Sequence, residues 1–173
     1  MKIALVYYSL DGNTAFAAEK IGQRLGADIL RLKPVKEYPT EKIAKYFWAG
    51  NSASFQESPK LIPYYFDINM YDVIILGTPI WAGTFAPPLR TFIHAQVWEG
   101  RKVAFFACCS GSGTEKCFQQ LHHETRGSIK LSTLRLIDPM RNAGTELDTA
   151  IAGFCEGISR DMLMEVDQQL QFR

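Results

Sequence analysis

Residues able to bind an anion gather in one short stretch near the N-terminus, Ser9-Leu10-Asp11-Gly12-Asn13-Thr14. An apolar run precedes the stretch and a helix-like pattern follows it, so unpaired N–H groups and the positive end of a helix dipole are expected there. Ser9 and Thr14 add hydroxyl donors, and Gly12 removes a Cβ from a tight turn. The stretch predicts a phosphate cradle, and a capped helix start without any ligand is the alternative interpretation.

A second stretch, Thr78-Pro79-Ile80-Trp81-Ala82-Gly83, follows the apolar run Val73–Leu76. It places a large aromatic side chain at the tip of a loop that proline and small residues make rigid. An exposed tryptophan on such a loop can stack on a flat ring. The alternative is a tryptophan that packs in the core or in an interface.

A third stretch, Cys109-Ser110-Gly111-Ser112-Gly113, ends the apolar run Val103–Cys108. Its glycines allow backbone to approach a ligand closely, although a plain turn has the same composition. All three stretches follow predicted strands, and ligands of open α/β sheets bind at the carboxyl ends of the strands. Their joint placement therefore predicts one ligand site.

The elements that position these stretches alternate along the chain. Continuous apolar runs predict strands that are buried on both faces, and a 3.6-residue apolar period predicts helices. The predicted strands are Ile3–Tyr8, Ala27–Leu32, Val73–Leu76, Val103–Cys108 and Ile129–Ile137. The predicted helices cover Asn13–Leu25, the stripe of Leu89, Phe92, Ile93 and Val97, Thr114–Thr125, and the stripe of Leu147, Ile151, Phe154 and Ile158, extended by Leu163, Val166 and Leu170. This alternation predicts a three-layer, doubly wound α/β fold with five parallel strands.

Length and charge limit the function classes. The 173 residues suit a single domain over 1–173, in which an aromatic-rich and proline-rich insertion at about 33–70 carries a short helix around Glu41–Trp48. A net charge of +1 gives no reason to expect nucleic acid or an anionic membrane as partner. The apolar start is too short for a signal peptide or a membrane span, so we expect a cytoplasmic protein.

The remaining reactive residues predict no metal site. The four cysteines, Cys108, Cys109, Cys117 and Cys155, form no CxxC pair, and His122-His123-Glu124 is not an HExxH motif. We expect reduced thiols, with Cys108 and Cys109 on opposite faces of a sheet. His94 fits a helix C-terminus, where an imidazolium meets the negative end of the dipole.

The stretches YYSLDGNT at Tyr7–Thr14, GTPIWAG at Gly77–Gly83 and CSGSG at Cys109–Gly113 resemble the flavodoxin family, and the resemblance extends over nearly the whole chain. It implies the strand order 2-1-3-4-5 with FMN as cofactor. By position, Ser9, Asn13 and Thr14 would bind the FMN phosphate together with the backbone of Leu10–Gly12. Thr78–Gly83 would line the isoalloxazine with Trp81 near its face, and Cys109–Gly113 would meet the pyrimidine side.

Three departures from the family pattern bear on function. Asp11 stands where the family usually has Ser or Thr, and because a carboxylate repels phosphate we expect it to point outward or to cap the helix. The third stretch lacks the tyrosine that covers the outer ring face in many flavodoxins, so we expect an open face. Many electron-carrier flavodoxins are also acidic, whereas this chain is nearly neutral.

These features lead to three functional hypotheses. The first is an FMN-binding redox protein that transfers electrons through a non-covalently bound flavin, without a catalytic side chain, to a partner protein or a small-molecule acceptor. The second is an NAD(P)H-dependent quinone or flavin reductase, with the 33–70 insertion as a lid. The third is a cofactor-free binding module on the same fold, as monomer or homodimer like the others, for which Asp11 is the main argument.

Overall fold

The computed structural model describes residues 1–38 and 58–171, with side chains described as far as residue 162. Its main sheet contains β1 (Ile3–Tyr7), β2 (Asp28–Arg31), β3 (Val73–Trp81), β5 (Lys102–Cys109) and β6 (Ile129–Ile137) in the order β2-β1-β3-β5-β6. Each neighbouring pair in this order is parallel. Numbered without the short β4, this is the implied order 2-1-3-4-5, so the fold-class prediction is confirmed.

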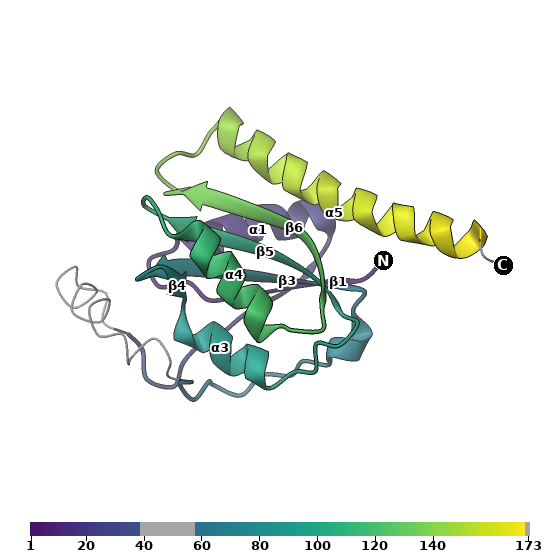
Figure 1. Cartoon of the computed structure of the whole chain (residues 1–173). Coiled ribbons are helices and arrows are strands. Elements are labelled where there is room, and N and C mark those ends of the chain that lie inside the picture. The colour runs from purple at the N-terminus through teal and green to yellow at the C-terminus, as the bar shows by residue number, and fades with distance from the viewer. Residues whose placement is uncertain (39–57, 172–173) are drawn as a thin grey trace.

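Helices cover both faces of the sheet (Figure 1). The helices α1 (Asn13–Leu25) and α5 (Thr145–Gln171) lie on one face, and α3 (Pro87–His94) and α4 (Thr114–Glu124) lie on the other. One core, which includes Ile21, Phe106 and Ile151, fills the space beneath α1 and α5. A second core, which includes Phe92 and Leu121, lies beneath α3 and α4. The fold therefore has three layers, and because the strands of the main sheet are parallel, their carboxyl ends lie at one edge of it.

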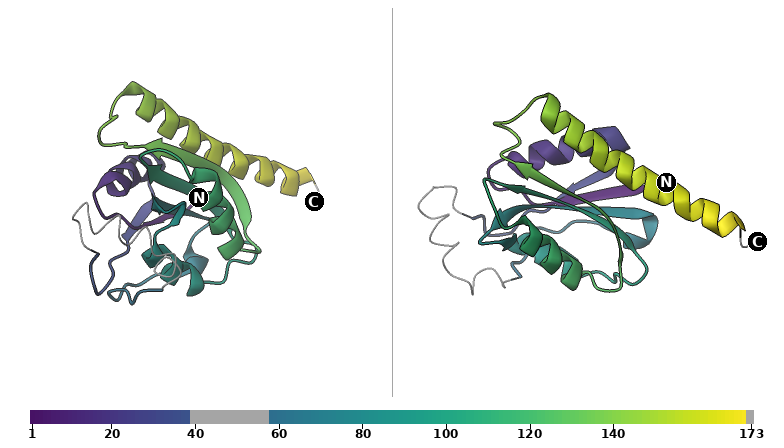
Figure 2. Two further views of the ribbon diagram at one scale, coloured as in Figure 1. Left: turned by 60° about the vertical axis from the view of Figure 1, so that its left-hand side comes forward. Right: turned by 45° about the horizontal axis from the view of Figure 1, so that its top comes forward.

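The predicted helical stripes account for most of the packing. Leu147, Ile151, Phe154 and Ile158 of α5 are all buried, as their spacing predicts. The helix continues to Gln171, and its C-terminal end extends past the sheet (Figure 2). The side chains of Leu163, Val166 and Leu170 lie outside the described part. Within the described residues, none of the helices is long and apolar enough to cross a membrane.

Two predictions about burial are wrong. Val97 does not belong to the stripe of α3, because the helix ends at His94 and the Val97 side chain is 74% exposed. The strand β6 is not buried on both faces. It lies at the edge of the sheet and alternates between buried Leu134 and Leu136 and exposed Arg135 and Ile137, because only the α5 side is covered.

The second predicted loop begins as strand. β3 runs through Gly77 to Trp81, and a two-residue strand, β4 (Thr84–Phe85), pairs with it antiparallel. Trp81 is opposite Thr84, so Ala82 and Gly83 form the turn of a hairpin. The prediction that β3 ends at Leu76 is therefore wrong, and the tryptophan stands at the tip of a ribbon.

The two ends of the connection between β2 and β3 pair with each other. Pro34 and Leu61 form an isolated antiparallel bridge, and the connection ends in a 3₁₀ helix, η2 (Ile68–Met70). The helix predicted at Glu41–Trp48 lies outside the described residues.

Candidate functional site

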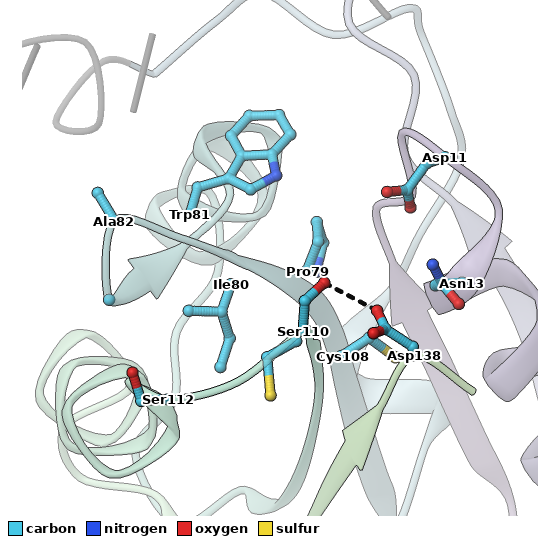
Figure 3. Close-up of a pocket in the computed structure, with 12 residues that line it drawn as sticks. Asp11, Asn13, Pro79, Ile80, Trp81, Ala82, Cys108, Ser110, Ser112 and Asp138 are labelled. Carbon is cyan, nitrogen blue, oxygen red and sulfur yellow. Dashed lines mark hydrogen bonds between the residues drawn. The ribbon is translucent and has the colours of Figure 1, made fainter. Parts of the chain in front are cut away.

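A cleft opens at the carboxyl ends of the strands and brings the three predicted stretches together (Figure 3). Its wall is made by residues from the loops that follow β1, β5 and β6 and from the β3–β4 hairpin. The lining residues are Asp11, Asn13, Pro79, Ile80, Trp81, Ala82, Gly83, Cys108, Cys109, Ser110, Ser112 and Asp138. The lining does not include the predicted residues Ser9, Leu10, Gly12, Thr14, Thr78, Gly111 and Gly113.

The loop from β1 to α1 contains buried hydroxyl groups that form no hydrogen bond with the described residues. The Ser9 and Thr14 side chains are buried, and neither hydroxyl has a hydrogen-bond partner among the described residues. Gly12 lies just before the first residue of α1, Asn13, with a φ of +95° that favours glycine, and no side chain caps the helix. The first N–H groups of the helix also lack partners within it. Buried donors at an uncapped helix start fit a phosphate group.

Asn13 joins this loop to the segment that follows β6. Its Oδ1 accepts a hydrogen bond from the Met140 N–H at 3.1 Å. Asp138, at the start of that segment, has the unusual φ of +39° and accepts a hydrogen bond from the Ser110 hydroxyl at 2.8 Å (Figure 3). The segment after β6 therefore forms a fourth wall of the cleft.

Sequence reasoning missed Cys108 and Asp138 as lining residues. Asp138 is a polar residue directly after the predicted strand Ile129–Ile137, and the rule that drew attention to the other loops would also have found it. Ser112 stands within the third predicted stretch. Cys108 ends the buried run, and no feature of its sequence context marks it.

The hairpin that carries Trp81 is held by its own residues. The Thr78 hydroxyl donates to the Pro79 carbonyl and accepts from the Ala86 N–H, each at 2.9 Å. Thr78 is therefore turned into the hairpin rather than into the cleft. Ala82 and Gly83 have φ values of +48° and +76°, which is the pattern of a type I′ turn.

The third loop contacts the hairpin directly. Gly113 precedes α4 with φ of +96°, and a Cβ built on it would lie 3.1 Å from the Gly83 Cα. The Gly111 carbonyl accepts a hydrogen bond from Arg135 of β6 at 2.7 Å. Close backbone approach and this arginine fix the loop that presents Ser110 and Ser112 to the cleft.

The electrostatics of the cleft are set by carboxylates. Asp11 and Asp138 line it, and no Lys or Arg does so among the described residues. The expectation that Asp11 caps the helix is wrong, because no side chain caps α1, and the exposed Asp11 residue borders the cleft. Burial raises the pKa of the Cys108 thiol to about 12. Cys108 is therefore a neutral part of the floor.

The described histidines lie away from the cleft, and His94 contacts a carboxylate of another helix. His94 Nε2 lies 2.7 Å from Glu124 Oε2, which links α3 to α4. Among the described residues there is no group of three or more His, Cys, Asp or Glu side chains placed to hold a metal ion.

Comparison with known proteins shows which proteins this chain resembles. A family model described as flavodoxin matches residues 2–145. A flavoprotein from Lactobacillus acidophilus, solved in complex with FMN, is 21% identical with a TM-score of 0.69, and the match covers 82% of this chain and 97% of that one. A candidate flavoprotein from Bacteroides eggerthii is 26% identical with a TM-score of 0.68, and the match covers 86% and 97%.

A more distant structure extends the range of activities found on this fold. An NADH:FMN oxidoreductase is 14% identical with a TM-score of 0.54, and the match covers 90% of this chain and 89% of that one. A search of curated proteins found no match to the chain.

Proposed function

This chain belongs to the flavodoxin family, and we propose that it binds one FMN non-covalently in the cleft and transfers electrons through it. FMN is the cofactor of this family, and the similar flavoprotein from Lactobacillus acidophilus was crystallised with it. The observation that carries the proposal is the pair of buried hydroxyls on Ser9 and Thr14, which have no partner among the described residues. Buried polar groups are rarely left unpaired, so an acceptor such as phosphate is expected beside them.

The chain's own residues would bind and orient the flavin, which supplies the redox chemistry when bound. Ser9, Thr14 and the N-terminus of α1 would hold the phosphate. The β3–β4 hairpin would present Trp81 to the ring, and Cys109 to Gly113 would border the ring on the other side. No side chain of the cleft needs to transfer a proton for electrons to pass.

The first test is the visible absorption of the purified protein, followed by titration with FMN and riboflavin. We expect tight FMN binding and much weaker riboflavin binding. Replacing Ser9 by Ala or Thr14 by Val should weaken FMN binding by about tenfold each, because a hydrogen bond to a charged group is lost. Riboflavin binding should change little. Ser159→Ala, which removes a hydroxyl bonded to the Cys155 carbonyl in α5, is the matched control.

Two outcomes would contradict this assignment. If neither flavin binds, the redox proposal fails and the binding-module hypothesis takes its place. If FMN and riboflavin bind equally well and lose affinity equally in both variants, the hydroxyls do not hold the phosphate.

A second candidate function is an NAD(P)H-dependent reductase of quinones or flavins. Ser110 and Ser112 are exposed at the third loop, and Trp81 is the only aromatic side chain that lines the cleft in the described part of the chain. An open face would admit a substrate. Bleaching of the flavin absorbance by NADH or NADPH in the absence of any second protein would favour the reductase, and its absence would favour the electron carrier.

A further inference from the structure

Tyr38 lies where the base of the β2–β3 connection meets the cleft. At this base the Val35 N–H donates to the Lys60 carbonyl and the Ile62 N–H donates to the Lys33 carbonyl, each at 2.8 Å. Leu32, just before, donates its N–H to the Tyr7 carbonyl at 2.8 Å. Hydrogen bonds therefore hold the backbone of residues 32–35 to β1 on one side and to residues 60–62 on the other. Tyr38 follows Val35, the last of these residues, by three positions.

Three aromatic rings meet beside the cleft. The Tyr38 and Trp81 ring centroids are 5.2 Å apart at an interplanar angle of 76°. Tyr8 lies 5.7 Å from Trp81 at 87° and 6.1 Å from Tyr38 at 70°. All three pairs have the edge-to-face arrangement that aromatic rings prefer. Of the three side chains, only Trp81 lines the cleft.

Tyr8 is the fixed member of this cluster. Its side chain is 4% exposed, and its N–H donates to the Gly77 carbonyl at 3.2 Å. Burial, followed by the neighbouring Tyr38, raises the pKa of its phenol, which is consistent with a ring shut away from water. Trp81 is half-buried at the tip of a hairpin, and both the buried Tyr8 ring and the Tyr38 ring contact it edge to face.

We propose that Tyr38 is a positioning residue, which holds the Trp81 ring in place against the cleft and so strengthens the binding of the flavin ring. The proposal rests on the proposed FMN site. A tryptophan that is free to change rotamer loses conformational entropy when a ligand orders it. A tryptophan that Tyr38 already holds loses less conformational entropy on binding, so the ligand binds more tightly.

The test compares Tyr38→Ala with Tyr38→Phe. The alanine variant should weaken the binding of FMN and riboflavin by the same factor, about two- to tenfold, because an aromatic pair that acts on the ring is lost. The phenylalanine variant keeps the ring and should bind like the parent. Tyr65→Ala, in the same connection but with a side chain that is 84% exposed, is the matched control and should have no effect.

A double-mutant cycle asks whether Tyr38 acts through Trp81. In a Trp81→Ala background, Tyr38→Ala should have no further effect on flavin affinity. An equal loss in both backgrounds, or no loss in the parent, would overturn the proposal. A loss for FMN alone would also overturn it, because it would place Tyr38 at the phosphate.

A measurement on the cofactor-free protein separates this inference from the proposed function. The near-ultraviolet circular dichroism band that disappears in Trp81→Phe belongs to Trp81, and it should collapse in Tyr38→Ala and persist in Tyr38→Phe. If the parent binds no flavin, the proposed function fails, and the proposed control of flavin binding fails with it. If flavin binds and this band is unchanged in Tyr38→Ala, Tyr38 does not position Trp81.

Discussion

At the scale of single residues, Cys108 and Cys109 show how one strand serves two environments. Cys108 packs in the core beneath α1 and α5 with Phe106. The Cys109 thiol lies 3.9 Å from the Thr114 hydroxyl at the start of α4, on the opposite side of the sheet. The alternation of side chains along a strand predicts this arrangement from sequence alone. Both thiols are buried, as are Cys117 and Cys155, and none of the four forms a disulfide.

Burial raises the pKa of three thiols, those of Cys108, Cys117 and Cys155, and so couples their titration to stability. The Cys117 side chain is fully buried, and burial raises the pKa of its thiol from 9.0 to about 12. Between about pH 9 and 12 the unfolded chain releases this proton and the folded chain keeps it, so the free energy of unfolding should fall as pH rises through that window. Urea denaturation at several pH values checks this, with Cys117→Ala expected to show a shallower decline. Parallel declines in both proteins would contradict the assignment.

At the scale of elements, the sequence identifies the hairpin as part of the site but misjudges where its strand ends. Pro79 marks a break in most central strands, and it suggested a loop from Gly77 onward. In the structure, β1 pairs with β3 only as far as Gly77, whereas β5 pairs with it as far as Pro79. A proline is tolerated where one side of the strand has no partner. Local residue preference could not show this, because it depends on where a neighbouring strand stops.

The turn of this hairpin provides a prediction about strain. Ala82 has a φ of +48°, in the left-handed region of the backbone. This conformation is unfavourable for most L-residues, whereas glycine and asparagine adopt it at a lower cost in free energy. Ala82→Asn gives the Asn-Gly pair that type I′ turns favour, and it should raise the free energy of unfolding by about 1 kcal/mol. Chemical denaturation measures the change. Ala95→Asn, at an exposed alanine with a φ of −85°, is the control and should give no gain, so equal gains would exclude turn strain as the cause.

The sequence analysis predicted neither the segment after β6 as a wall of the cleft nor the cluster of Tyr8, Tyr38 and Trp81. The helix α1 was predicted with its observed bounds, Asn13–Leu25, because an amphipathic period and a glycine mark both its face and its start. Asp138 borders the cleft, and Tyr38 contacts Trp81, through the folding together of segments that are far apart in the chain. No local pattern reports such contacts, since they depend on how the loops after β2 and β6 fold back.

At the scale of the whole molecule, alternating strands and helices predict a parallel sheet between two helical layers, but not the order of its strands. That order came from the resemblance carried by the three loop stretches, and the structure confirms it. The order places β3 between β1 and β5, so the central strand borders both cores and the cleft at once. Packing at its centre should therefore affect stability and the site together.

Gly77 and Phe106 test this coupling, because they are register partners on β3 and β5. A Cβ on Gly77 would overlap the Phe106 ring, which is fully buried in the core beneath α1 and α5. Gly77→Ala should therefore lower the free energy of unfolding by about 1–3 kcal/mol through overpacking. Phe106→Leu, which leaves space at the same point, should cost about 1–2 kcal/mol alone. Combined, the two changes should cost less than their sum, as measured by urea denaturation. Strict additivity would mean that the methyl group is accommodated elsewhere and does not press on the Phe106 ring.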